Sequence, residues 1–311
     1  MRLIFLGTPD FAVPTLERMV EAGHEVPLVV TQPDRPRGRG QNAGPPPVKE
    51  AARLLGLRVY QPERVRRPES VERLRDLAAD GMVVVGYGQI IPQVVIDLVP
   101  LGIINVHASL LPKYRGAGPI QWAIINGETR TGVTTMRIDA GLDTGDMLLK
   151  AETEVGPDEN AIDLGKRLAG LGARLLVETI AGLAAGTIVP EKQDPAQATL
   201  APLLKKEDGL IDWRQNARAI HNRVRGLQPW PGAYTTFRGQ TMHIWQSRVV
   251  PGEAAPIPGR LVSLKPLTVA CGGLALELLT VQLEGRKRIS AADFANGQRL
   301  TENDMIGDSH P

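Results

Sequence analysis

The sequence has a single cysteine, few aromatic residues and no long hydrophobic run. Of its 311 residues one is cysteine, and 4% are Phe, Trp or Tyr. Cys271 alone can form neither an internal disulfide nor a site of several thiolates, so we expect a reducing compartment, the cytoplasm. No apolar stretch reaches the length of about 18 residues that a membrane-spanning helix needs. The apolar run Met1–Leu6 ends at Gly7, too early for a secretion signal.

The chain also lacks a strong excess of either charge. Its 36 Lys and Arg residues nearly balance 34 Asp and Glu residues, which leaves a net charge of +2. This balance excludes a basic coat over the whole chain, so a nucleic acid would have to be bound by local patches. With 42% hydrophobic residues a sizeable core can form, and the length suits about two domains.

Short apolar runs alternate with helical stretches through the amino-terminal half. The pattern predicts strands at 3–6, 26–30, 57–60, 82–85 and 102–106, and helices at 11–22, 48–55 and 69–78. Such alternation is typical of an α/β, Rossmann-like, doubly wound fold on a parallel sheet. A further strand pair at 132–138 and 147–155, and a long helix over 158–185, are expected to complete this domain.

The composition changes in the last third of the chain. Residues 186–209 mix Pro, Gln and charge without clean periodicity, as a surface linker would. After a helical stretch, short runs punctuated by Gly and Pro predict a small antiparallel β-barrel, with strands within 230–239, 241–250, 259–264, 267–271 and 274–283. We therefore expect a catalytic domain over 1–189, a linker over 190–208 and a barrel domain over 209–311.

Two polar loops near the middle of the chain are where we expect chemistry. Asn105 and His107 lie two residues apart on a predicted strand, so an amide and an imidazole leave the same face. Asp143, bracketed by Gly141 and Gly145, lies in a second loop that an adjacent strand end could bring to the imidazole. A carboxylate there would favour the imidazolium and fix the ring, and the amide could donate to a developing oxyanion. This pairing suits transfer of a carbonyl group.

Taken alone, these residues also have ordinary explanations. A single histidine near a strand end is more often structural than catalytic. Asp139, Asp143 and Asp146 could be turn residues, since Asp-Gly and Asp-x-Gly sequences often form turns. A bound dinucleotide is not expected, because the turn over residues 7–10 lacks the second and third glycines of that fingerprint.

The motifs around these residues resemble those of one family. Ser109–Gly116, preceded by Asn105-Val106-His107 and followed by Gly141–Asp146, is similar to the signature of the formyltetrahydrofolate-dependent formyltransferases. The resemblance runs nearly end to end, through 5–12, 31–34, 87–92 and 225–233, and is closest to the branch that acts on methionyl-tRNA. It implies a Rossmann-like catalytic domain and a carboxyl-terminal barrel of the OB type. It also implies 10-formyltetrahydrofolate as donor and the α-amino group of methionyl initiator tRNA as acceptor, a reaction that serves translation initiation.

The resemblance implies a role for each residue of the trio. The amine would attack the formyl carbon on N10 of the folate, and Asn105 and protonated His107 would stabilise the resulting oxyanion. Asp143 would hold His107 and help, through water, to move the proton to N10. No metal, nucleotide or stable protein partner is implied. Folate contacts are expected mainly with the backbone of one loop and with two further walls, at Ser109, Leu110, Leu111, Pro112, Gln89, Ile90, Ile91, Asp139 and Gly141. Plain core packing is the alternative for Leu110 and Leu111.

Two groups of cations are candidates for contact with tRNA. Arg35, Arg37 and Arg39 lie among helix breakers, where a solvated loop is the common explanation. In the tRNA-specific branch a basic loop at this point resembles a wedge that meets the acceptor stem, which favours RNA contact, although residues 41–44 stand where further lysines are common. The second group, near the start of the barrel, has ordinary helix charges as its alternative and comprises Lys205, Lys206, Arg214, Arg218, Arg223 and Arg225.

Three other functions stay open at this point. A formyltransferase that acts on an amino-sugar nucleotide would share the trio and the two-domain layout, but the cations at 35–40 argue against it. A glycinamide-ribonucleotide formyltransferase is a single-domain protein that needs neither the region after 209 nor this loop. A noncatalytic RNA-binding protein with a degenerate enzyme domain is disfavoured by the intact trio.

Overall fold

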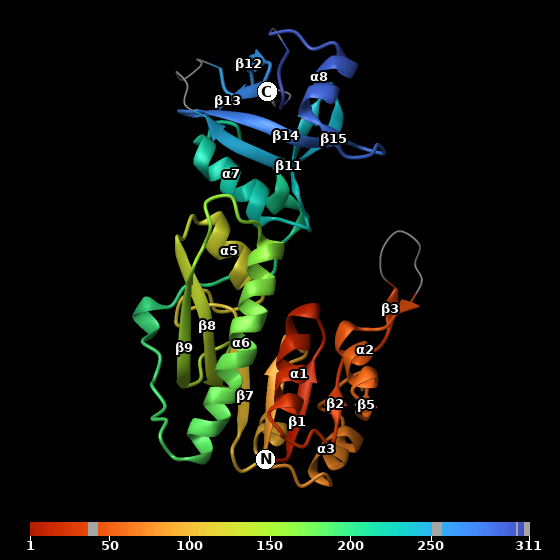
Figure 1. Ribbon diagram of the computed structural model, residues 1–311, viewed down its shortest axis with the longest axis vertical. Coiled ribbons are helices and arrows are strands. Elements are labelled where there is room, and N and C mark those ends of the chain that lie inside the picture. Colours follow the sequence, from red (N-terminus) through yellow and green to blue (C-terminus); the bar gives the residue numbers. More distant parts are fainter. Residues whose placement is uncertain (37–42, 251–256, 303, 308–311) are drawn as a thin grey trace. The chain divides into compact units, whose positions relative to one another are not determined.

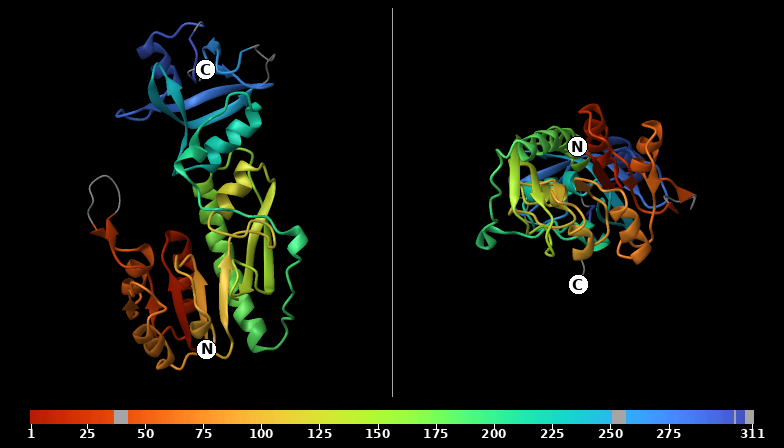
Figure 2. Two further views of the ribbon diagram at one scale, coloured as in Figure 1. Left: turned by 180° about the vertical axis from the view of Figure 1, so that it is seen from behind. Right: turned by 90° about the horizontal axis from the view of Figure 1, so that it is seen from below.

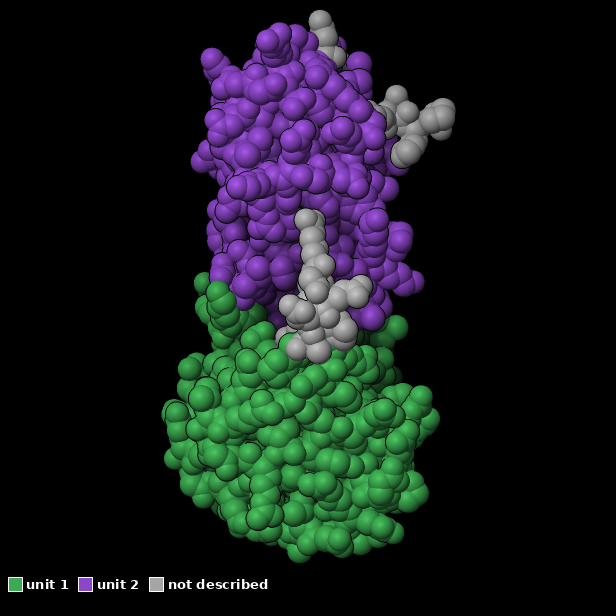
Figure 3. All heavy atoms as spheres, turned by 90° about the vertical axis from the view of Figure 1, so that its right-hand side faces the viewer, with its two compact units in different colours: residues 1–117, 130–154, 165–201 green, residues 118–129, 155–164, 202–311 purple. Residues whose placement is uncertain are grey.

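The computed structural model describes residues 1–311 except 37–42, 251–256, 303 and 308–311 (Figure 1). The chain divides into two compact units, coloured separately in Figure 3. The first unit comprises 1–117, 130–154 and 165–201, and the second comprises 118–129, 155–164 and 202–311. The second unit thus includes two segments that lie within the catalytic domain expected from the sequence, and that expected division stays a prediction.

A seven-stranded sheet forms the centre of the first unit. Its order is β5-β2-β1-β6-β7-β8-β9, with strands β1 (Leu3–Gly7), β2 (Val29–Val30), β5 (Val59–Tyr60), β6 (Gly81–Val85), β7 (Ile103–His107), β8 (Arg130–Arg137) and β9 (Met147–Glu154). The five strands from β5 to β7 are parallel, and β8 and β9 are antiparallel to their neighbours. The Rossmann-like α/β fold is therefore confirmed, with a mixed sheet in place of a wholly parallel one.

Alternating side chains of this sheet pack against helices on its two faces. Ile4 and Leu6 of β1 join a buried cluster that includes Leu74 of α3 (Pro68–Arg75) and Val95 of α4 (Gln93–Ile96). On the opposite face a side chain on Gly172 of α6 (Ala161–Ala184) would meet Val106, so glycine permits close approach of the helix. Helix α1 (Val13–Glu21) lies on the same side of the strands as α6 in Figures 1 and 2.

The parallel strands end at one edge of the sheet, and this edge carries the candidate site. Gly7 of β1 lies beside Val85 of β6, and Val84 lies beside Asn105 of β7. The loops that leave this edge carry the remaining short elements of the amino-terminal half: η1 (Asp10–Ala12), β3 (Arg35–Pro36), β4 (Ala43–Gly44) and α2 (Pro47–Leu54). Open α/β sheets bind ligands at such an edge, where the strand order reverses.

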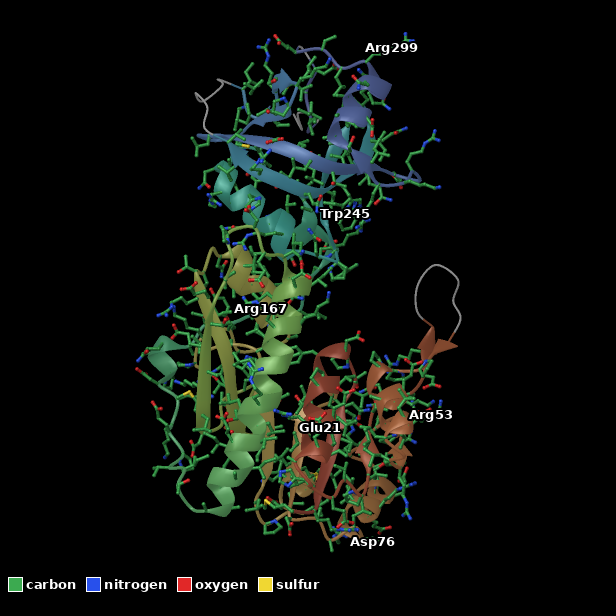
Figure 4. All side chains as sticks on the ribbon, viewed as in Figure 1. Glu21, Arg53, Asp76, Arg167, Trp245 and Arg299 are labelled. Atoms are coloured by element: carbon green, nitrogen blue, oxygen red, sulfur yellow. The ribbon has the colours of Figure 1, made fainter. Side chains whose placement is uncertain are left out.

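The second unit is built on a six-stranded antiparallel sheet, which confirms the expected small barrel-like domain. Its strands are β10 (Ala233–Phe237), β11 (Gln240–Val250), β12 (Leu261–Leu264), β13 (Leu267–Ala270), β14 (Ala275–Leu283) and β15 (Ile289–Ser290). Helices α5 (Pro119–Ile125), α7 (Ala217–Gly226) and α8 (Ala291–Gln298) complete the unit. Within β11 the pairing with β14 shifts between Ile244 and Ser247, an irregularity that bends a strand. Trp245, labelled in Figure 4, lies in this region.

Residues 191–200 of the expected linker form an ordered segment along the first unit, which we call the strap. Glu191 pairs with Met147 at the start of β9, and Leu200 pairs with Arg115. The strap contains one short 3-10 helix, η2 (Pro195–Gln197), and a second, η3 (Lys206–Gly209), follows it in the second unit. None of the helices in the described part of the chain has the length and apolar character of a membrane span. The described residues also contain no group of three His, Cys, Asp or Glu side chains that could hold a metal ion.

Candidate active site

His107 and Asp143 meet at the end of β7, as the sequence suggested. The His107 Nδ1 atom lies 3.6 Å from Asp143 Oδ2, and the two side chains are 6% and 18% exposed. The other ring nitrogen, Nε2, lies 2.9 Å from the Tyr114 carbonyl oxygen. Because a carbonyl only accepts, Nε2 must carry a proton, and Nδ1 is the atom that faces the carboxylate. A protonated imidazole therefore matches both of its neighbours.

Asp143 is held by its own backbone as well as by its side chain. Its φ of 52° lies in the left-handed region, which Asp tolerates better than most residues. The carboxylate Oδ2 accepts a 2.9 Å hydrogen bond from the Gly116 backbone N–H. Two residues on, a side chain at Gly145 would come within 1.9 Å of the Arg137 carbonyl oxygen. The loop thus requires glycine at 145, and its shape directs Asp143 toward His107.

Asn105 lies two residues before His107 on the same strand and is half-buried. It is opposite Met136 of β8, as His107 is opposite Thr134. The side-chain amide of Asn105 forms no hydrogen bond with any residue in the described part of the chain. Its donors are therefore not committed to the fold, in contrast to Nε2 of His107, which bonds to the Tyr114 carbonyl.

The loop expected to bind folate is anchored by its own polar groups. The Ser109 hydroxyl donates to the Lys113 carbonyl, at 2.6 Å. The Thr134 hydroxyl donates to the Ser109 carbonyl and accepts from the Leu111 N–H, at 2.7 and 3.1 Å. Leu111 is buried against Met136 and Met147, so core packing accounts for this side chain. Leu110 and Pro112 are half-buried.

The first of the two further predicted walls comprises Gln89, Ile90 and Ile91, which differ in exposure. Gln89 ties its loop to residues 62–65, since Oε1 accepts from the Val65 N–H and Nε2 donates to the carbonyls of Pro62 and Glu63. Ile90 is 90% exposed, whereas Ile91 is buried in the core below the sheet. Of the two isoleucines, only Ile90 therefore offers an apolar surface to a ligand.

Asp139 and Gly141, which we predict as the second wall, build a turn. The Asp139 carboxylate accepts hydrogen bonds from the Gly141 N–H, at 3.0 Å, and from the Thr144 hydroxyl, at 2.8 Å. Asp139 thus has the turn role that was the alternative for all three aspartates of this loop. Asp143, by contrast, directs its carboxylate at Gly116 and His107.

The candidate tRNA-binding cations of the first unit are described only in part. Arg37 and Arg39 lie outside the described residues. Arg35 is exposed and lines a pocket of about 240 Å³, whose other walls are Thr8, Gln32, Pro33, Gly44, Pro46 and Gly88. This pocket lies where the loops after β1, β2 and β6 come together, at the reversal of the strand order.

The cations of the second unit fall into two groups. Lys205 and Lys206 are exposed, and Arg223 is half-buried with one Nη donating to the Asp208 carbonyl. Arg225 is only 6% exposed, and it donates to the carbonyls of Gly156 and Glu159 and to the amide oxygen of Asn222. Burial lowers the pKa of Arg225 below its ordinary value. Arg225 is therefore a buried side chain that links α7 to the 155–160 segment, and not a surface cation.

Sequence reasoning missed the partners that hold the site together. They are the Tyr114 carbonyl, the Gly116 N–H, the Thr134 hydroxyl and the side chain of Gln193, near the start of the expected linker. Two of these partners are backbone groups, which residue type does not reveal. Gln193 lies in an aperiodic segment and belongs to no motif, so no signal in a single sequence marks it.

Comparison with known proteins identifies the class of this enzyme. Residues 1–180 match the family described as formyl transferase, and residues 203–299 match the formyl transferase C-terminal domain. A solved N-formyltransferase from Helicobacter canadensis, in complex with folinic acid and dTDP-3-aminofucose, shares the fold. It has a TM-score of 0.68 and 18% identity, over 89% of this chain and 98% of that chain. Fold and site together therefore define a formyltransferase.

Curated relatives narrow the identification. The methionyl-tRNA formyltransferase of Solibacter usitatus is 76% identical over 310 residues, which covers 100% of both chains. That of Koribacter versatilis is 56% identical over 308 residues, or 99% of each chain. The chain belongs to the methionyl-tRNA formyltransferase family.

Proposed function

We propose that this enzyme transfers the formyl group of 10-formyltetrahydrofolate to the α-amino group of methionyl initiator tRNA. The observation that carries the proposal is the His107–Asp143 pair at the end of β7, in a chain that is 76% identical over its whole length to a methionyl-tRNA formyltransferase. The amino-sugar-nucleotide alternative has weaker support, since the solved N-formyltransferase that holds such a sugar shares only 18% identity with this chain.

The reaction joins nitrogen to the formyl carbon through a tetrahedral intermediate. The neutral amine attacks that carbon, and the negative charge gathers on the former carbonyl oxygen. Asn105 donates to this oxygen through its uncommitted amide, and the imidazolium of His107 stabilises it electrostatically. Such interactions act on charge that the ground state lacks, so they raise kcat more than they strengthen binding.

Proton movement completes the transfer. The attacking nitrogen must lose a proton, and the N10 atom of the folate must gain one as the carbon–nitrogen bond to it breaks. Asp143 is the base that we assign to this step, through water, while it keeps His107 oriented. The 3.6 Å between His107 Nδ1 and Asp143 Oδ2 exceeds a normal hydrogen-bond length. Both groups therefore keep capacity for contact with the reacting atoms.

Folate and tRNA are assigned to different surfaces. The proposed folate contacts are the backbone of 109–112, the exposed Ile90 and the turn at 139–141. For the tRNA we propose the loop that starts at Arg35, together with the exposed Lys205 and Lys206 and the half-buried Arg223. Arg225 is left out because it is buried and its Nε and Nη1 groups donate within the fold. A cytoplasmic location completes the proposal, in keeping with the single cysteine.

A comparison of three acceptors tests the proposed function. The full chain is incubated with 10-formyltetrahydrofolate labelled in its formyl group, and with methionyl initiator tRNA, methionyl elongator tRNA or an amino-sugar nucleotide. We expect transfer to the initiator tRNA at the highest kcat/KM. Faster transfer to the sugar nucleotide would contradict the assigned acceptor, and no transfer to any amine would contradict the assigned chemistry.

A further inference from the structure

Gln193 is a buried polar side chain that touches both loops of the candidate site. It is 8% exposed, although its neighbours Lys192 and Asp194 are exposed. Its Nε2 donates to the backbone carbonyls of Asp143 and Gly145, at 2.8 Å each. Its Oε1 accepts from Arg115 Nε at 2.9 Å. One amide thus joins the loop that carries Asp143 to the loop that contacts both His107 and Asp143.

The surroundings of this amide fix its orientation. Two of its neighbours are carbonyl oxygens, which only accept, and the third is a guanidinium nitrogen, which only donates. The NH2 group must therefore face the Asp143 loop, and the oxygen must face Arg115. The reverse orientation would leave a buried donor against a donor and two carbonyls against an oxygen, which is costly.

The rest of the strap reinforces the same two loops. Met147 and Glu191 exchange backbone hydrogen bonds at 2.8 and 2.9 Å, just beyond Gly145. The Thr199 hydroxyl accepts from the Tyr114 N–H at 2.9 Å, and the Arg115 N–H donates to the Thr199 carbonyl. Tyr114 is the residue whose carbonyl receives His107 Nε2. The strap therefore contacts the backbone next to both members of the pair.

We infer that Gln193 is a positioning residue for formyl transfer, which acts by holding the loop of Asp143 in the conformation that aims its carboxylate at His107. The Asp143 loop needs such support, because Asp143 has a left-handed backbone and the loop turns within a few residues. A side chain in such a loop is aimed only as well as its backbone is held. The inference rests on the role proposed for Asp143.

Two near-isosteric variants test this inference in the full chain. Gln193→Met keeps the volume and removes all three hydrogen bonds, and Gln193→Glu keeps the shape but replaces the NH2 donors with an oxygen. We expect kcat to fall about tenfold to a hundredfold in each, with the KM for methionyl-tRNA and for the folate nearly unchanged. The matched control is Gln197→Met, since Gln197 lies exposed on the same strap and its side chain bonds to the neighbouring Asp194.

A double-mutant comparison separates positioning from general damage. If Gln193 acts through Asp143, adding Gln193→Met to Asp143→Asn should lower kcat little beyond the single Asp143→Asn change. Independent contributions would multiply, and that result would overturn the inference. Normal kcat in Gln193→Met and Gln193→Glu, together with a large loss in Asp143→Asn, would also overturn the inference. That outcome would leave the proposed function intact. Normal turnover in Asp143→Asn itself would remove the proposed mechanism and this inference together.

Discussion

His107 and Asp143 are brought together by two antiparallel strand pairs rather than by nearness in sequence. His107 ends β7, which pairs with β8, and Asp143 lies in the loop that joins β8 to β9. Both side chains are largely buried, at 6% and 18% exposure. The His107 ring is fixed from the far side by the Tyr114 carbonyl. The fold itself thus positions the pair at the edge of the sheet.

The amide of Asn105 gives the first prediction. Asn105→Asp keeps the shape of the side chain and removes both N–H donors, and it puts negative charge where the oxyanion must form. We expect kcat to fall by a hundredfold or more, on the order of what loss of an oxyanion donor costs. Folate affinity, measured by titration with tetrahydrofolate, should change little. A variant that loses folate binding in proportion to kcat would assign Asn105 to binding instead.

The basic loop gives the second prediction. Replacing Arg35, Arg37 and Arg39 together with Ala removes cations that we place near tRNA phosphates. The KM for methionyl-tRNA should rise, and its dependence on salt concentration should flatten. Folate binding should stay the same. Three exposed arginines in the last turns of α1 and α3, Arg18, Arg73 and Arg75, serve as the matched control. An equal effect of both triple variants would indicate that the loop is an ordinary solvated surface and does not contact tRNA.

His221 gives a prediction about pH and stability. Burial is the largest cause that lowers the pKa of His221 below its ordinary 6.5, so the folded chain resists a proton that the unfolded chain accepts. The contribution of this residue is fully present above about pH 6.5 and is lost as the pH falls through the lowered folded value. We expect the denaturant midpoint to fall between pH 7.5 and 5.5, and to fall less in His221→Gln. Equal slopes in the two proteins would contradict this assignment.

Cys271 gives a prediction about reactivity. The thiol is buried, and burial raises its pKa to about 12. Because the thiolate is the reactive form, the folded chain should resist a thiol reagent at pH 8, and the unfolded chain should react with one equivalent. Rapid labelling of the native protein would show that the fold around this strand end opens readily.

Much of the site follows from the sequence because its signals are local. Asn105, His107 and Asp143 stand in motifs at the ends of recognisable strands, and the structure brings His107 and Asp143 together. The antiparallel pairing of β9 with β8 is a matter of connection length. Only residues 138–146 join these strands, too few for the crossover that a parallel pair needs.

The features that sequence reasoning missed depend on backbone groups and on burial. Gln193 is fixed by carbonyls at 143 and 145, and polar type alone suggested an exposed linker residue. Arg225 reads as a surface charge, yet α7 buries it beside His221 and Asn222, where carbonyls of the 155–160 segment accept its hydrogens. Periodicity predicts which apolar residues are inside, but it does not predict which polar residues find buried partners.

The single-turnover rate of formyl transfer to methionyl initiator tRNA, compared between the native enzyme and His107→Ala, tests the central claim most directly. Both substrates are kept saturating, and His24→Ala, at a half-buried histidine of the same unit, is the control. Because the imidazolium acts on charge that only the transition state carries, the rate should fall by about a hundredfold or more in His107→Ala. It should stay near normal in His24→Ala. A His107→Ala rate within about threefold of the native rate, too small a loss for a transition-state interaction, would contradict the assignment of the active site.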